Sequence, residues 1–150
     1  MKTKILILVT VFLTITSCSL SNDTNEGPVE VTLIHWNLIN VTGGIAGVDN
    51  DFEVGDIVWN ADEFNSVLAV NNSNTDNTIE DGLASGSYDF VLFEASGDIF
   101  TVIDGNEFGK IYISETDNTL LIIDQNELSF GPQADGFIYT FKITTSTIEI

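Results

Sequence analysis

Side chains that commonly carry out catalysis are scarce in this chain of 150 residues. It has one histidine, His35, one cysteine, Cys18, and no arginine. Any Ser-His-Asp or Cys-His arrangement would therefore have to use His35. A zinc site built on His and Cys needs more ligands than this inventory offers. We therefore expect no enzyme activity, no cofactor and no metal site, and we interpret His35 as a surface or strand-end residue.

Carboxylates are the abundant chemical groups, with 23 Asp and Glu residues. Two segments concentrate them, and their acids are Asp49, Asp51 and Glu53 in the first and Asp76, Glu80 and Asp81 in the second. An EF-hand loop needs Gly at its sixth position, where these segments have Val54 and Asp81. We interpret both as solvated acidic loops, and a looser calcium cage remains an open alternative.

The only cysteine follows a segment with the pattern of an export signal. A positively charged start precedes an apolar run over residues 5–15, which is too short to cross a bilayer. The letters ITSC at residues 15–18 resemble a bacterial lipobox. That resemblance implies a lipoprotein signal peptide over residues 1–17 and a mature chain anchored to the membrane by acyl chains, such as palmitate, on Cys18. An ordinary signal peptide with an incidental cysteine is the alternative.

Net charge narrows the choice of partners. Removal of residues 1–17 removes two lysines and no acid, so 2 lysines remain against 23 acids, a formal charge of −21. Such a charge repels the phosphates of nucleic acids and of anionic lipid headgroups. We therefore expect no nucleic acid partner and no attraction to an anionic membrane surface.

Residues 18–28 read as a disordered acidic tether, because after Cys18 they contain almost no apolar residue. About ten such residues give a typical reach near 18 Å. Acids soon after the lipidated cysteine resemble surface-export signals of Bacteroidota lipoproteins. The predicted location is the outer membrane, on its periplasmic or its cell-surface face.

Residues 29–150 show the pattern of an all-β domain, since short apolar runs alternate with Gly, Asn and Asp. The eight predicted strands are Val31–Thr42, Phe52–Asn60, Phe64–Asn71, Ser87–Ala95, Asp98–Ile103, Phe108–Ser114, Thr119–Asp124 and Phe137–Thr144. Tight connections favour an up-and-down antiparallel order, and eight such strands close into a barrel without exposed edges. A β-sandwich is the alternative fold.

Aromatic side chains recur on the predicted strands and are candidates for the barrel interior. An interior of this size holds either packed side chains or one small ligand. The candidate lining residues are Trp59, Phe90, Phe100, Phe137, Tyr139 and Phe141. Their spacing does not distinguish a ligand-binding cavity from a packed core.

Two short motifs carry a family resemblance. The stretches HWNLINVTGG and DGFIYTFKI resemble the first and last strands of lipocalin-like lipoproteins of Bacteroidota. The resemblance implies that Trp36 and Leu38 pack at the barrel floor. A META-type β domain also begins with a Trp-x-Leu strand and is a second candidate. Ile34 stands where the lipocalin signature has Gly.

Together these features predict a membrane-tethered, non-enzymatic lipoprotein whose lipocalin-like barrel binds a small apolar or amphipathic ligand. The alternative is a structural or interaction lipoprotein that binds an envelope protein or a glycan through its outer surface or mouth loops. An exposed apolar patch would favour that alternative.

Overall fold

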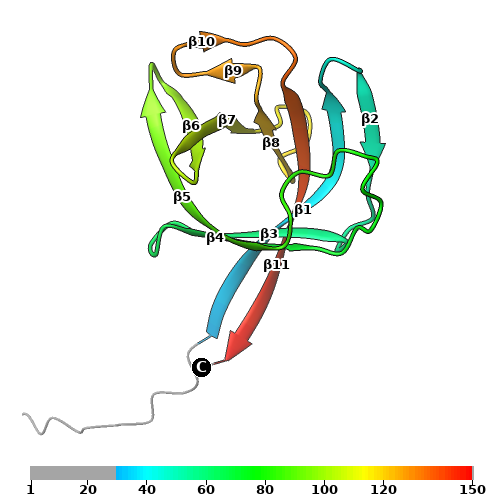
Figure 1. Ribbon diagram of the computed structural model, residues 1–150. Coiled ribbons are helices and arrows are strands. Elements are labelled where there is room, and N and C mark those ends of the chain that lie inside the picture. The colour runs from blue at the N-terminus through cyan, green and yellow to red at the C-terminus, as the bar shows by residue number, and fades with distance from the viewer. Residues whose placement is uncertain (1–29, 150) are drawn as a thin grey trace, which may run out of the picture.

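The described chain forms a closed antiparallel barrel of eight strands, as the sequence predicts (Figure 1). The computed structural model describes residues 30–149, so the predicted signal peptide, Cys18 and the tether lie outside the described residues. Neighbouring strands pair in an up-and-down order, and the last strand pairs with the first to close the ring. The strands of the ring are β1 (Glu30–Gly43), β3 (Ile57–Asp62), β4 (Val67–Asn72), β5 (Gly86–Ala95), β6 (Asp98–Ile103), β7 (Asn106–Ile113), β8 (Leu120–Asp124) and β11 (Phe137–Glu149).

Three short strands lie outside this ring: β2 (Val48–Asp51) extends the sheet beside β1, and β9 (Glu127–Leu128) pairs with β10 (Gly131–Pro132). The single closed ring is incompatible with the alternative of two facing sheets. Within residues 30–149 no helix has the length and hydrophobicity that a membrane span requires.

The predicted strand Phe52–Asn60 is wrong at its start. The chain leaves β2 at Asp51, turns, and enters the ring only at Ile57. The turn is closed by the N–H of Asp56, which donates to the carbonyl of Glu53 at 3.1 Å, and Gly55 in it has a positive φ of 101°. The residues on either side of the turn are typical of strands, so the sequence did not indicate it. Gly55 makes the turn possible, because glycine adopts the left-handed conformation at little cost.

The hydrophobic core fills the inside of the ring, because alternate residues of each strand point inward. The buried core cluster comprises Leu38, Val41, Ile57, Trp59, Leu68, Val70, Phe90, Ile103, Ile111, Leu121, Ile123, Tyr139 and Phe141. A shift of register between β6 and β7 adds one residue to β7, and the Phe108 ring reaches the core, 6.0 Å from that of Trp59 and 5.4 Å from that of Tyr139. A bulge redirects side chains in this way.

β1 and β11 continue together beyond the ring. They pair along their whole length, from Gly43 with Phe137 to Glu30 with Glu149. Figure 1 shows the two strands leaving the barrel as a ribbon, next to the β3–β4 hairpin. β1 pairs with β3 only at Trp36 and Asn37, so residues 30–35 have separated from the neighbour that β1 has inside the ring.

Candidate functional site: a groove outside the barrel

The barrel interior is filled by side chains. Trp59, Leu38 and Phe141 are fully buried, and the rings of Trp59 and Phe141 have centroids 4.9 Å apart. The loop between β4 and β5 covers this cluster, because the Cβ position of Gly82 lies only 3.3 Å from the indole ring of Trp59. The space between the strands is therefore occupied by protein around Trp59.

All six predicted lining residues are buried or half-buried, but one of them packs apart from the others. Trp59, Phe90, Tyr139 and Phe141 belong to the core cluster, and Phe137 is half-buried against it. Phe100 is also buried, being 5% exposed, but it lies outside that cluster and stacks on Phe93, its cross-strand neighbour, at 5.6 Å. Both faces of β6 are apolar, so the sequence did not reveal which alternate residues point inward.

The two predicted floor residues lie close together in space but differ in burial. Leu38 is fully buried, whereas Trp36 is half-buried against the core, with its ring 6.0 Å from Phe90 and 6.3 Å from Phe141. Trp36 is also where β1 meets β3, next to the point at which the ribbon leaves the ring. It therefore covers the core at the end of the barrel from which the ribbon extends.

One polar atom in the core lacks a partner. The indole Nε1–H of Trp59 is a buried donor, and no hydrogen-bond acceptor lies within its reach among the described residues. Nearby, the hydroxyl of Tyr139 donates to Glu80 at 3.1 Å. Burial, and then the Glu80 carboxylate, raise the pKa of Tyr139 well above its usual value. Tyr139 is therefore a neutral hydrogen-bond donor at all ordinary pH values.

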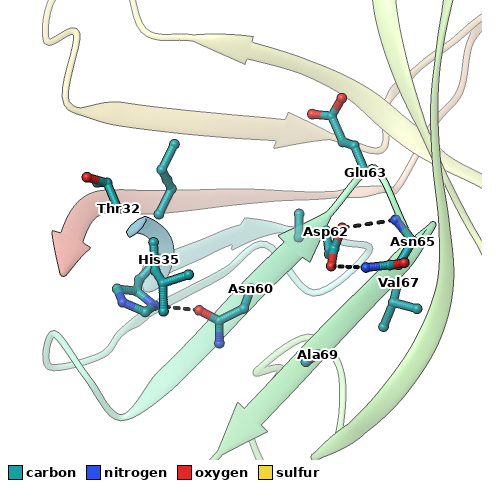
Figure 2. Close-up of a pocket in the computed structure, with 11 residues that line it drawn as sticks. Thr32, His35, Asn60, Asp62, Glu63, Asn65, Val67 and Ala69 are labelled. Atoms are coloured by element: carbon teal, nitrogen blue, oxygen red, sulfur yellow. Dashed lines mark hydrogen bonds between the residues drawn. The ribbon is translucent and has the colours of Figure 1, made fainter. Parts of the chain in front are cut away.

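A hollow lies outside the ring, between the ribbon and the β3–β4 hairpin. Its volume is about 780 Å³, and Figure 2 shows how its residues face one another across it. The lining residues are Thr32, Leu33, Ile34 and His35 from β1, and Asn60, Ala61, Asp62, Glu63, Asn65, Val67 and Ala69 from the hairpin. We call this hollow the ribbon groove. A second hollow of about 380 Å³ shares Asn65 and Val67 with it.

His35 connects the two walls of the ribbon groove. Its Nδ1 lies 2.5 Å from the Oδ1 of Asn60 on β3, and its Nε2 lies 2.7 Å from the Oγ of Ser146 on β11. A carbonyl oxygen only accepts, so Nδ1 carries the proton and Nε2 accepts from the serine hydroxyl. The order Ser-His-Asn matches a nucleophile, its base and an orienting group. Asn60 is neutral, however, and Ser146 lies on an exposed strand, so the arrangement lacks the carboxylate and the enclosure that such sites use.

The tip of the β3–β4 hairpin gives the groove its charge. Asn65 donates its backbone N–H to Asp62 at 2.9 Å and its side-chain amide to the same carboxylate at 2.7 Å. These bonds, the side-chain bond first, lower the pKa of Asp62, so its carboxylate is ionised at neutral pH. Glu63 follows it, and Phe64 between Glu63 and Asn65 is 96% exposed. The hairpin tip therefore presents an aromatic ring beside two acids to the solvent.

The acidic segments considered for calcium have protein partners in the structure. Asp49 and Asp51 both accept from the amide of Asn40, at 2.8 and 2.9 Å. Asp81 accepts from the amides of Asn72 and Asn74, at 3.0 and 2.8 Å. Within residues 30–149 no group of three His, Cys, Asp or Glu side chains is arranged to hold a metal ion. These carboxylates act locally, by accepting hydrogen bonds from asparagine amides.

Sequence reasoning identified His35 but not the groove around it. The sequence predicts a strand beginning at Phe64 in the segment ADEFNS, whereas residues 63–66 form a turn. The signal that was available is the Asp62-x-x-Asn65 spacing, which favours a side-chain to backbone turn. The ribbon wall carried no comparable signal, because its residues resemble those of any strand.

The groove outside the barrel and the interior of the barrel differ in how they are filled. The ribbon groove combines apolar walls with the Asp62 carboxylate, whereas the interior is packed around Trp59. The resemblance to lipocalin-like lipoproteins stays a prediction based on short motifs. Compared with family models, with curated proteins and with solved structures, the chain has no match in any of the three.

Proposed function

We propose that the protein is a lipid-anchored envelope protein that binds a partner protein through its outer surface, with the barrel as a rigid support. The observation that carries this proposal is the contrast between the packed interior and the ribbon groove of about 780 Å³ outside it. A barrel that binds a small apolar ligand inside would need open space where Trp59, Leu38 and Phe141 are in contact with their neighbours.

The proposed anchor is the lipid on Cys18, at the outer membrane. Glu30 begins the ribbon, so a tether over residues 18–28 would attach the barrel at the end where the groove lies. With a reach of about 18 Å, the groove would remain close to the bilayer surface. A partner there is most simply another envelope protein.

Fatty-acid labelling tests the anchor. We expect an alkyne-tagged palmitate analogue to label the wild-type chain in its own organism, and Cys18→Ala to remove both the label and the sedimentation with membranes. A Ser21→Ala chain serves as the matched control and should behave as wild type. Labelling that persists in Cys18→Ala would contradict the proposed anchor.

Site-specific crosslinking tests the partner. A photoreactive amino acid is placed at Asn65 beside the groove, at Val91 on β5, or at Ser129 between β9 and β10, in the full chain expressed in its own organism. We expect a discrete protein adduct at one or more of these exposed sites after irradiation. The proposal would be wrong if no site gave a protein adduct while gently purified protein carried a small molecule in stoichiometric amount.

A second candidate function has one observation in its favour. The unpartnered Nε1 of buried Trp59 is a donor suited to a small ligand with an acceptor group, or to an internal water. Native mass spectrometry of the purified full chain tests for a bound small ligand, since a ligand adds a fixed mass to the protein. We expect no added mass; a ligand lost in Trp59→Phe would instead favour binding inside the barrel.

A further inference from the structure

Two strand edges are left without a partner where the ribbon leaves the ring. β1 pairs with β11 along its full length, but on its other side it has neighbours only at Trp36, Asn37 and residues 40–43. β3 pairs fully with β4, yet on its other side it meets β1 only at Val58 and Trp59. In the part of the chain that the structure describes, the edges of residues 30–35 and 60–62 therefore have no strand beside them.

The backbone groups on these edges point into the ribbon groove. Ile143 donates its N–H to Thr119, on the side of β11 away from β1. Its cross-strand partner Trp36 therefore directs its own N–H and C=O away from β11, and by alternation Ile34 and Thr32 do the same. These groups of β1 face the hairpin across the groove, and they have no hydrogen-bond partner within residues 30–149.

The walls of the groove favour a particular kind of side chain. Leu33, Ile34, Val67 and Ala69 offer apolar contact, whereas Asp62 and Glu63 place negative charge at the hairpin end. Among residues 30–149 no lysine lines the groove: Lys110 pairs with Asp98 and Glu127, and Lys142 pairs with Asp117. The charge of the groove is thus uncompensated, and an occupant that carries a basic residue would complement it.

We propose that the ribbon groove binds an extended segment of the partner protein, which adds as a strand to the free edge of β1 and directs a lysine or arginine to Asp62 and Glu63. This inference rests on the proposed function and specifies its site. Strand addition uses main-chain hydrogen bonds for affinity and alternate side chains for specificity. At about 3.3 Å per residue, the free edge of residues 30–35 accommodates about six residues.

Three other occupants fit less well. The tether of this chain carries the acids Asp23 and Glu26 and no basic residue, so it would be repelled by the groove. A second copy related by symmetry would bring its own Asp62 and Glu63 toward those of the first. An anionic bilayer would meet the same negative charge. Phe64, 96% exposed at the hairpin tip, offers the proposed partner an aromatic contact next to the groove.

The test uses the full mature chain in detergent and three synthetic peptides of eight residues. The first alternates lysine and valine, the second alternates glutamate and valine, and the third is the lysine peptide with its pairing amides N-methylated. Binding is measured by calorimetry, and the site by amide hydrogen exchange. We expect the lysine peptide to bind and to slow exchange at Thr32 and Ile34, and the glutamate peptide not to bind.

Protein variants separate a specific site from general attraction to an acidic protein. Asp62→Asn combined with Glu63→Gln should weaken the lysine peptide about three- to tenfold, as expected for two exposed charge pairs. Glu115→Gln, on an exposed turn away from the groove, is the matched control and should change binding little. N-methylation should weaken binding about tenfold or more, because several backbone hydrogen bonds are lost. Thermal melts confirm that each variant is folded.

Several results would overturn the inference. They are the absence of binding, equal binding by the N-methylated peptide, equal weakening by the control substitution, and slowed exchange elsewhere than residues 30–35 and 60–62. The outcome is independent of the crosslinking experiment. A protein adduct at Val91 or Ser129 with no peptide binding in the groove would leave the proposed function standing and remove only this site.

Discussion

The two ends of β1 differ in their neighbouring strands and in the burial of their side chains. Between Trp36 and Gly43 the strand pairs with β11 on one side and, in two stretches, with β3 and β2 on the other, and its side chains Leu38 and Val41 are fully buried. From Glu30 to His35 it has β11 alone, and Ile34 is 56% exposed. The comparison shows that one continuous strand serves both as a wall of a filled barrel and as a wall of an open groove.

The packing of the barrel interior is tested most directly at Trp59. Trp59→Ala removes the largest fully buried side chain and leaves a cavity, so we expect a loss of about 3–5 kcal/mol in the free energy of unfolding. Urea unfolding measures it, with Phe64→Ala as the exposed aromatic control. A loss below about 1 kcal/mol would mean that the interior is not tightly packed.

Gly109 tests how closely two strands of the ring approach. A Cβ atom added there would lie 2.6 Å from the backbone oxygen of Asp124 on β8. We expect Gly109→Ala to cost about 1–3 kcal/mol, because backbone rather than a flexible side chain must move. The comparison is with Gly97→Ala, where no atom lies within 4 Å and only the positive φ of 91° opposes the change. A smaller cost at Gly109 than at Gly97 would contradict the tight β7–β8 contact.

Tyr139 makes the stability of the interior depend on pH in the alkaline range. Burial raises its pKa in the folded state, so its contribution to stability is fully present below the unfolded value near 10. Above that pH the unfolded chain loses this proton first, and stability falls by up to about 1.4 kcal/mol per pH unit. We expect Tyr139→Phe to show a shallower alkaline slope than the wild type, whereas Tyr112→Phe should change it less. Equal slopes for wild type and Tyr139→Phe would contradict the assignment.

The hydrogen bonds of His35 test whether the groove walls are linked. His35→Ala should cost about 1 kcal/mol, because it removes bonds to Asn60 and Ser146 at a half-buried site. A double-mutant cycle with Ser146→Ala should give a coupling of about 0.5 kcal/mol or more. We also expect faster amide exchange in residues 30–35 than in the ring. Additive effects in the cycle would show that the contact contributes nothing.

The smallest stability effect is expected at the hairpin tip. Phe64→Ala should change the free energy of unfolding by less than about 0.5 kcal/mol, since its ring is 96% exposed. The same substitution should reduce the crosslinked adduct formed from Asn65, because it removes an aromatic contact available to a partner. A large loss of stability, with the adduct unchanged, would assign Phe64 to the fold instead of to recognition.

The closed eight-stranded ring could be predicted because local signals agree along the chain. Turn residues separate short β-branched and aromatic runs, and the predicted strand Asp98–Ile103 has the same bounds as β6 in the structure. Errors arose where local signals were ambiguous, as at Phe52 and Phe64, which have strand-like neighbours but lie outside strands. The sequence predicts that the last strand ends at Thr144, whereas pairing with β1 extends it to Glu149.

The sequence by itself determined the strand class and the strand order, because these depend on short patterns of apolar and turn residues. The anchor at Cys18 stays a prediction from the sequence. Only the tertiary structure decided that Phe100 packs against Phe93 outside the core cluster and that Trp59 lies within a packed interior. It alone placed His35 between Asn60 and Ser146. The physical reason is that these properties depend on which residues become neighbours when the ring closes, and on where β1 separates from β3.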